Sequence, residues 1–566
     1  MSERILFIIP PYFNIDDYLP GNNRSSVMPP FTIPYGILSL QAYMKAHCTT
    51  PVEIEIMDLN LPMRQAVEAN DTEGLLSHFD DMIAERVREF RPTIAGISAL
   101  FNISFRYIGD VARVVRHNAP DALIVAGGGL PSAAYQQVLE MCPAVDAICK
   151  GEGEIPLCDL VDAEDRSELL ERHASWITRM GVTAGKIPGH TFVQNLDDIP
   201  MLEYGALNLD NYNSRSIDKR YTGEKKREMA IHTSRGCPFK CVFCSNPSLH
   251  GHDVRAMSVE RVASEVRRMK EEYGMTVLLI EDDHFFYDKA RAKAVLRALV
   301  EMNVRIEFPN GVAVYAIDDE VSELFSKAGV STVALAVESG SDYVLNKIIK
   351  KPLKTIMVKD KVKMLRAHGV QSHVFIVLGL PGELDEHRQQ TLDLLLDVGF
   401  DWAHVFCAVP IFGSRLHEIC VDKGYIEETN FLDHVNTKSV IRAPGVDPDE
   451  IERAAYQINL MVNFVHNYNL KAGNYETAKR YFENVVNKYP THAFGHHALA
   501  RAYEGLGQAE AAAECRRHFE EIVAGDDWWR EQSENYGLVD TVRANLKGHD
   551  RFSLKRAVEM ATPMAS

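Results

Sequence analysis

In the first 160 residues, short runs of apolar residues alternate with stretches in which apolar side chains recur at helical spacing. The runs lie at residues 5–9, 52–58, 93–98 and 122–127, and the helical stretches at 34–45, 72–90 and 104–118. Short apolar runs are typical of parallel strands that are buried on both faces of a sheet. Strands that alternate with helices predict a doubly wound, Rossmann-like domain of parallel strands over residues 1–162.

The same alternation resumes at residue 229, whereas the last part of the chain is patterned as helices only. Six strand–helix units fill residues 229–445, and ligands of such folds bind at the carboxyl ends of the strands. Residues 163–228 are polar and irregular, which predicts a linker. Residues 446–566 are predicted to be α-helical, and the apolar face between 451 and 469 is expected to pack on the α/β region. The chain is therefore expected to be a multidomain α/β protein.

A short internal repeat lies in the helical region. Residues 470–478 recur 34 residues later at 504–512, and 34 residues is the period of tetratricopeptide repeats. Three repeats are usually needed for an independently stable array, and only two are present here. These helices are therefore expected to pack against the flanking helices. Such repeats form concave surfaces for partner proteins, but a bundle that caps the α/β region is an equally good interpretation.

Composition limits the partners and the compartment. The 566 residues carry a net charge of −18 at pH 7, which argues against non-specific binding to nucleic acid or to an anionic membrane. Apolar residues make up 46% of the chain, yet no run approaches the roughly 18 apolar residues of a membrane span. The ten cysteines show no disulfide framework. We therefore expect a cytoplasmic protein with no nucleic-acid or membrane partner.

Three cysteines form a possible metal site. Cys237, Cys241 and Cys244 stand four and then three residues apart, on a loop that follows a predicted strand. Iron–sulfur clusters are held mainly by thiolates, and three of them leave one iron of a four-iron cluster open to a small chelating molecule. The alternative is a structural zinc site, for which His232 or His250 would have to supply a fourth ligand. The spacing favours the [4Fe–4S] cluster.

The C-x3-C-x2-C spacing, with the aromatic Phe243 before the last cysteine, resembles the cluster loop of radical S-adenosylmethionine (SAM) enzymes. The resemblance implies a partial (β/α)6 barrel of the TIM type over residues 229–445, with a [4Fe–4S] cluster on the three cysteines. It also implies that SAM is cleaved reductively to a 5′-deoxyadenosyl radical. Such an enzyme needs a low-potential electron donor of the flavodoxin or ferredoxin type.

The same resemblance implies a set of residues that contact SAM. They are Phe243 in the cluster loop, Asp282 and Asp283 at the amino group, Glu338 at the ribose, and Gly379 and Gly382 beside the adenine. Each residue taken alone is also explained as a helix cap or a turn after a strand. Their order along successive predicted strands favours the functional interpretation.

The first domain resembles the cobalamin-binding domain of class B radical SAM enzymes. The matching stretches are 34–36, 96–98, 127–132 and 150–154, the last reading Lys-Gly-Glu-Gly-Glu. The resemblance implies that cobalamin is contacted by Tyr35, Gly36, Ser98, Gly127, Gly128, Gly129, Gly151 and Glu152. Tight strand-to-helix turns would also explain the glycines. Because no Asp-x-His-x-x-Gly motif is present, the resemblance implies cobalamin bound base-off without a histidine ligand.

The pairing of the two domains implies a cobalamin-dependent radical SAM methyltransferase, which transfers methyl from methylcobalamin to an unactivated carbon. One alternative keeps the cofactors but forms a ring or rearranges the substrate, as oxygen-independent porphyrin-ester cyclases do. Another is a non-catalytic scaffold that responds to cobalamin or SAM, with a protein partner at the helical repeats. The sequence identifies neither the substrate, which would be a small molecule or carrier-bound, nor the side chains that move protons.

Overall fold

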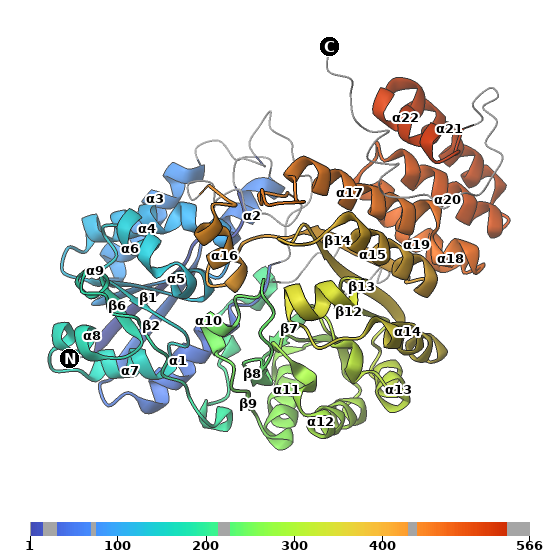
Figure 1. Ribbon diagram of the computed structural model, residues 1–566. Helices are drawn as coiled ribbons and strands as arrows, with labels where there is room; N and C mark the ends of the chain where they lie inside the picture. Colours follow the sequence, from blue (N-terminus) through green and yellow to red (C-terminus); the bar gives the residue numbers. More distant parts are fainter. Residues whose placement is uncertain are drawn as a thin grey trace, which may run out of the picture. The chain divides into compact units, whose positions relative to one another are not determined.

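The computed structural model describes residues 2–14, 18, 31–69, 75–212, 227–427 and 438–539. Figure 1 labels their helices and strands along the chain. The described residues form two compact units. The first unit contains the described residues up to 212, those from 227 to 310 and those from 410 to 427, and the second contains residues 311–409 and 438–539. The boundary after Asn310 falls inside the range predicted for the barrel. Its six strands are therefore described below in two groups of three.

A six-stranded sheet organises the first domain of the first unit. Its strands are β1 (Glu3–Ile9), β2 (Val52–Asp58), β3 (Ile94–Ser98), β4 (Leu123–Gly127), β5 (Ala147–Cys149) and β6 (Trp176–Thr178). They lie in the order β2-β1-β3-β4-β5-β6, and all pairs are parallel except β5 with β6. The predicted doubly wound parallel sheet is confirmed.

Helices cover both faces of this sheet. On one face, Ile5 and Phe7 share a core with side chains of α1 (Tyr35–His47) and α7 (Glu154–Asp162). On the other face, Leu6 and Ile8 share a core with α3 (Leu75–Phe90) and α4 (Phe105–Asn118). Successive strand residues point to opposite faces, so the apolar run at residues 5–9 serves both cores. The other helices are α2 (Asn60–Glu68), α5 (Gly129–Ala133), α6 (Tyr135–Met141) and α9 (Arg179–Thr183).

The structure differs from the sequence prediction at the end of this domain. The range 163–228 is predicted to be a linker, but it begins with α8 (Arg166–Arg172) and the edge strand β6. Trp176 of β6 is fully buried, and its Nε1 donates to the carbonyl of Pro156 at 3.1 Å. A three-residue strand after a polar helix is too short to show a periodic pattern, which is why the sequence analysis missed it.

The first unit also holds the first three strands of the predicted barrel. They are β7 (Glu228–Ile231), β10 (Val277–Ile280) and β11 (Arg305–Glu307), parallel and in the order β11-β10-β7. The helices α11 (Val259–Tyr273) and α12 (Lys289–Glu301) connect them, and the side chain of Ser258 caps the first of these. Two shorter helices of this unit are α10 (Pro247–His250) and α16 (Arg415–Lys423).

The second unit holds the other three strands. These are β12 (Thr332–Glu338), β13 (Gln371–Leu378) and β14 (Trp402–Cys407), and all pairs are parallel. The helices of this part are α13 (Asp319–Lys327), α14 (Val358–Ala367) and α15 (Asp385–Val398). All six predicted strands are therefore present, and each is followed by a helix.

The end of the described chain is helical, as predicted. Its helices are α17 (Pro448–Leu460) with a π-helical turn (Met461–Val465), α18 (Tyr468–Lys471), α19 (Tyr475–Lys488), α20 (Ala493–Gly505), α21 (Ala509–Gly525) and α22 (Asp527–Asn535). Helices α19 and α21 begin 34 residues apart, and so do α20 and α22, so the sequence repeat is also a structural repeat of helix pairs. The side chain of Asn463 bonds both backbone groups of Ala403, which ties the first of these helices to β14 as expected.

Among these described helices, none is both long and apolar enough to cross a membrane.

Candidate functional site

The three cysteines lie on a loop that a short antiparallel ladder closes. Strand β8 (Ser234–Arg235) pairs with β9 (Arg255–Ala256), and residues 236–254 form the loop between them. Gly236 begins the loop with φ +91°, and a Cβ there would lie 2.5 Å from the carbonyl oxygen of Asp253. Only glycine fits this close backbone crossing.

The donor set of this loop fits an iron–sulfur cluster. Cys237, Cys241 and Cys244 are partly buried and form no disulfide with any described residue, and Cys244 N donates to Cys241 O at 3.1 Å. Burial raises the pKa of Cys244 to about 12, and the charges of the other two thiols act in the same direction. Thiols that resist ionisation in each other's presence become thiolates when a cation offsets their charge. Phe243 is partly buried in the same loop, and its contact with SAM stays a prediction.

The zinc alternative gains no support. His250 Nδ1 lies 2.9 Å from a carboxylate oxygen of Glu152, and His232 Nε2 lies 3.6 Å from Glu281, so each has a partner other than the cysteines. No three His, Cys, Asp or Glu side chains in the described part of the chain are arranged to hold a metal ion. A four-iron cluster is larger than one ion, so its cysteines need not converge on one point.

Asp282 and Asp283 follow β10 and hold the start of the cysteine loop. Asp282 is buried, and its oxygens accept from Thr233 N, Thr233 Oγ1 and Ser234 Oγ, each at 2.6 Å. Burial raises the pKa of this carboxyl, while the hydrogen bonds from Ser234 and Thr233 lower it. Asp283 accepts from Gly236 N at 3.0 Å and from the side chain of Asn246 at 2.7 Å. The structure thus assigns both residues a role in holding the loop, and their contact with SAM stays a prediction.

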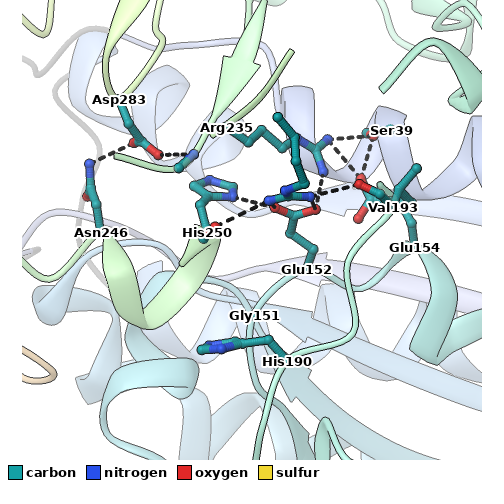
Figure 2. Close-up of polar contacts among 12 residues, drawn as sticks. Ser39, Gly151, Glu152, Glu154, His190, Val193, Arg235, Asn246, His250 and Asp283 are labelled. Atoms are coloured by element: carbon teal, nitrogen blue, oxygen red, sulfur yellow. Dashed lines mark hydrogen bonds and ion pairs between the residues drawn. The ribbon is translucent and has the colours of Figure 1, made fainter. Parts of the chain in front are cut away.

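A buried cluster of charges joins the first domain to the ladder that closes the cysteine loop. Figure 2 shows Glu152 facing Arg235 and His250, with Glu154 and Ser39 beside the same arginine. Glu152 accepts from Arg235 at 2.9 Å, from both terminal nitrogens of Arg255, and from His250 at 2.9 Å. Glu154 accepts from Arg235 at 2.9 Å and from the hydroxyl of Ser39 at 2.7 Å.

The charges of this cluster compensate one another. Both carboxylates and both guanidinium groups are at most 7% exposed. Burial alone would raise the pKa of Glu152, but the charge of Arg235 and the hydrogen bonds from Arg255 and His250 bring it well below its usual range. Burial likewise would lower the pKa of Arg235, and Glu154 and Glu152 raise it instead. Two carboxylates therefore face two guanidinium groups in a site closed to water.

Three residues predicted to contact cobalamin lie in or beside this cluster. Glu152 is one of them, and the adjacent Gly151 has φ +85°, with a hypothetical Cβ 2.7 Å from the ring of His190. Tyr35 is buried, and its ring centroid lies 4.9 Å from that of His232, directly before the cysteine loop. Gly36 has open space where a Cβ would stand. Cobalamin contact stays a prediction for all four residues. Three of them, Glu152, Gly151 and Tyr35, lie where the first domain meets the residues around the loop.

The other predicted cobalamin residues meet at the carboxyl edge of the first sheet. Ser98 and Gly127 are register partners at the ends of β3 and β4, and Gly128 and Gly129 follow directly. A Cβ on Gly128, whose φ is +95°, would lie 2.6 Å from the Ala99 carbonyl oxygen. The strand order reverses between β1 and β3, and ligands of doubly wound sheets bind at such a switch point.

The same edge exposes apolar surface. Leu100 and Phe101, which follow β3, are 59% and 50% exposed. Two exposed apolar side chains beside glycine turns suit contact with a large, partly apolar ligand. The residues present therefore fit a cobalamin site.

In the second unit, Glu338 combines backbone strain with a buried ion pair. It ends β12 after an irregularity in register, it has φ +73°, and it is 7% exposed. Its carboxylate lies 2.9 Å from Nζ of Lys351, and a π-helical segment (Val344–Ile349) separates the two residues. Left-handed non-glycine residues and π-helices are both enriched at functional sites. A simple helix cap or turn does not explain this arrangement.

The turn that carries Gly379 and Gly382 is closed by the carboxylate of Glu383, a residue that the sequence patterns do not single out. Both glycines have positive φ, and Gly379 N donates to Glu383 Oε2 at 2.6 Å. Glu383 is fully buried, and none of the described residues forms a hydrogen bond with its Oε1. Burial raises the pKa of Glu383 to about 7, partly offset by the bond from Gly379.

A chain of hydrogen-bonded rings on β13 and β14 also escaped the sequence analysis. His373 lies 3.1 Å from His404 and 2.8 Å from the hydroxyl of Tyr481, which belongs to α19. The Tyr481 hydroxyl donates to Gln371 at 2.7 Å, and its ring stacks on Trp402. Histidines on neighbouring strands carry no local signal of their pairing, because their proximity depends on strand register.

Comparison with known proteins identifies the two α/β domains. Residues 231–395 match the Radical SAM superfamily, and residues 27–161 match the B12 binding domain. The chain therefore combines a B12-binding domain with a radical SAM domain, and it is an enzyme of the radical SAM type. These domains account for the predicted cofactors, which are SAM, a [4Fe–4S] cluster and cobalamin.

Relatives extend over most of the chain. It is 28% identical over 465 residues to the cytidylyl-2-hydroxyethylphosphonate methyltransferase of Streptomyces wedmorensis, covering 76% of this chain and 86% of the relative. It is 24% identical over 471 residues to the anaerobic magnesium-protoporphyrin IX monomethyl ester cyclase of Rubrivivax gelatinosus, covering 81% and 76%.

A solved structure shares the fold. The radical SAM methyltransferase TsrM from Kitasatospora setae, with cobalamin and a [4Fe–4S] cluster bound, superposes with a TM-score of 0.56 at 15% identity, covering 91% of this chain and 100% of that one. The sequence thus predicted both domain types, and the relatives of this chain include a methyltransferase and a cyclase.

Proposed function

We propose that this protein is a cobalamin-dependent radical SAM methyltransferase that methylates an unactivated carbon of its substrate. The proposal rests on one observation. Within the first unit, buried ion pairs connect the domain that contains the B12-type sheet to the strands that close the three-cysteine loop. When bound, the cluster and SAM supply the radical, and cobalamin supplies the methyl group.

The side chains of this protein would bind, orient and shield the cofactors. We assign Cys237, Cys241 and Cys244 to the cluster, and the loop-holding Asp282 and Asp283 keep their backbone in place. We assign Glu338, Gly379 and Gly382 to SAM, and Ser98 with Gly127 to Gly129 to cobalamin. These assignments are supported by positions at the carboxyl ends of β3, β4, β10, β12 and β13.

The products decide between methyl transfer and the alternatives. Anaerobically reconstituted protein would be incubated with SAM, a reductant and extracts of the source cells. A methyltransferase of this kind must form S-adenosylhomocysteine and 5′-deoxyadenosine together. Formation of 5′-deoxyadenosine with substrate turnover but without S-adenosylhomocysteine would instead support ring formation, to which the similarity to the Rubrivivax cyclase points. Absence of SAM cleavage would contradict both.

The helical end suggests a protein partner. Its helix pairs repeat with the 34-residue tetratricopeptide period, and Tyr456, Tyr489 and Trp528 are 38%, 52% and 43% exposed. The rings of Tyr456 and Trp528 lie 5.4 Å apart, and aromatic residues of this kind are enriched at interface hot spots. We propose that this surface receives a carrier-bound substrate or a partner enzyme. A low-potential flavodoxin or ferredoxin is the proposed electron donor.

The proposed compartment is the cytoplasm, because exposed low-potential clusters need reducing surroundings and no disulfide joins any of the ten cysteines in the described part of the chain. The proposed domains are 1–162 for cobalamin, 163–228 as a linker, 229–445 for the barrel and 446–566 for the helices. The position of β6 supports moving the first of these boundaries beyond Thr178.

A further inference from the structure

Glu152 lies at the point where the first domain meets both strands that close the cysteine loop. One of its carboxylate oxygens accepts from Arg235 of β8 and from Arg255 of β9, each at 2.9 Å. The other accepts from Arg255 at 2.5 Å and lies 2.9 Å from Nδ1 of His250, which is inside the loop. A single side chain of the first domain therefore contacts the beginning, the interior and the end of the loop segment.

The ladder itself is too short to hold the loop firmly. Strands β8 and β9 have two residues each, and they close a loop of residues 236–254. Two-stranded ladders are marginal in water even when they are longer. Contacts outside the ladder must therefore supply most of the order of this segment.

Charge balance makes Glu152 the critical member. Glu154 forms an ion pair with Arg235 but not with Arg255. Among the described residues, Glu152 is the one ion-pair partner of Arg255. The other hydrogen bonds of Arg255 go to the carbonyls of Val193 and His250. Loss of the Glu152 charge would leave two buried guanidinium groups beside one carboxylate. Breaking a buried pair by removing one partner is strongly destabilising, because the remaining charge is uncompensated.

We infer that Glu152 is a positioning residue for the iron–sulfur cluster: it fixes the cysteine loop through Arg235 and Arg255, so the B12-binding domain forms part of the support of the cluster. This inference rests on the proposed assignment of the three cysteines. It gives the Lys-Gly-Glu-Gly-Glu stretch a task distinct from cobalamin contact.

The test uses the full-length protein and the Glu152→Gln variant, which keeps the size of the side chain but removes its charge. Hydrogen–deuterium exchange of the iron-free protein reports loop order without any cofactor. We expect exchange across residues 236–256 to become faster by on the order of tenfold or more, with little change in α4. After anaerobic reconstitution we expect less than about half of the wild-type iron per chain, because ordering the loop then competes with binding.

Two further variants separate positioning from general destabilisation. Glu265→Gln is the matched control, because Glu265 is also buried and ion-paired, with Arg261 at 3.2 Å, but has no bond to the cysteine loop. It should lower the midpoint of thermal unfolding while leaving loop exchange and iron content unchanged. The double variant Glu152→Gln with Arg255→Gln leaves Arg235 paired with Glu154, so it should recover much of the protection that Glu152→Gln loses.

The outcomes distinguish this inference from the proposed function. If wild-type protein binds four irons and Glu152→Gln matches it in loop exchange and iron content, the positioning role of Glu152 is wrong while the function stands. If Glu265→Gln affects the loop equally, or the double variant recovers nothing, the effect is general destabilisation and the inference is also wrong. If wild-type protein holds no cluster and cleaves no SAM, the proposed function itself fails.

Discussion

The candidate sites of the two units are stabilised in different ways. In the first unit, the charged groups around the cysteine loop have protein partners: Asp282 accepts three hydrogen bonds, and Glu152 accepts from two arginines. In the second unit, Glu338 has a strained backbone, and Glu383 has a buried oxygen to which the described part of the chain supplies no hydrogen-bond partner.

This difference indicates that the two sites respond differently to ligands. A network with satisfied hydrogen bonds is ordered before its cofactor arrives, whereas strain and an unpaired buried group cost free energy that a ligand can offset. We therefore expect substitutions in the first unit to act on cluster assembly. Substitutions in the second unit should act on SAM affinity and on the pH dependence of stability.

The largest effect is expected for the three cysteines that we propose as cluster ligands. Cys241→Ala should abolish four-iron occupancy and SAM cleavage together, because two thiolates cannot hold the cluster. Anaerobic iron counting and detection of 5′-deoxyadenosine provide the measurement, and Cys420→Ala, a buried cysteine outside the loop, is the control. A Cys241 variant that kept four irons per chain and its activity would show that the metal site is elsewhere.

The second effect concerns Glu338. Glu338→Gln should weaken SAM binding by about tenfold to a hundredfold, since hydrogen bonds to charged groups are worth about 1.5–3 kcal/mol. Binding would be measured by calorimetry on anaerobic protein with the cluster in place. Glu323→Gln is the control, because Glu323 also pairs with a lysine but is 49% exposed. Unchanged affinity in Glu338→Gln would refute the ribose assignment.

A third prediction concerns the helical end. The sequence suggests that a cut after Asn469 would remove only the repeats, but Leu460 and Phe464 pack in one core with Ala478 and Phe482. We therefore expect this truncation to aggregate rather than to stay soluble and cleave SAM. Trp528→Ala with Tyr489→Ala leaves that core intact and tests recruitment instead. SAM cleavage should persist, and turnover of the physiological substrate should fall. Full turnover would argue against a docking role.

The last prediction concerns Glu383 and the pH dependence of stability. Its pKa of about 7 in the folded protein lies above the ordinary 4.5, so the folded state binds the proton more tightly than the unfolded state. The protonated Glu383 therefore contributes up to about 3 kcal/mol to the free energy of unfolding below pH 4.5, and this contribution is lost as the pH rises towards 7. Glu383→Gln should flatten this part of the profile of thermal midpoint against pH in iron-free protein. A parallel profile would show that Glu383 does not titrate there.

Much of the architecture was predictable from local patterns. Apolar runs and helical periodicity identified the strands and their connecting helices, because a buried strand or helix face requires apolar residues at regular, short sequence spacing. The spacing of Cys237, Cys241 and Cys244 predicted the cluster loop for the same reason, since all three ligands lie within eight residues of sequence. The 34-residue repeat likewise appears as helix pairs with that spacing.

Tertiary structure alone decided which polar residues meet. The pairing of Glu152 with Arg255 joins positions 103 residues apart, and His373 meets Tyr481 across 108. Neither pairing leaves a periodic or local signal, because it depends on how sheets and helices pack and on strand register. The sequence thus predicted the cysteine loop and the domain types, whereas packing determined that Glu152 of the first domain contacts Arg235, Arg255 and His250 around that loop. A buried charge must find its partner wherever the fold brings one within reach, and sequence distance does not limit that choice.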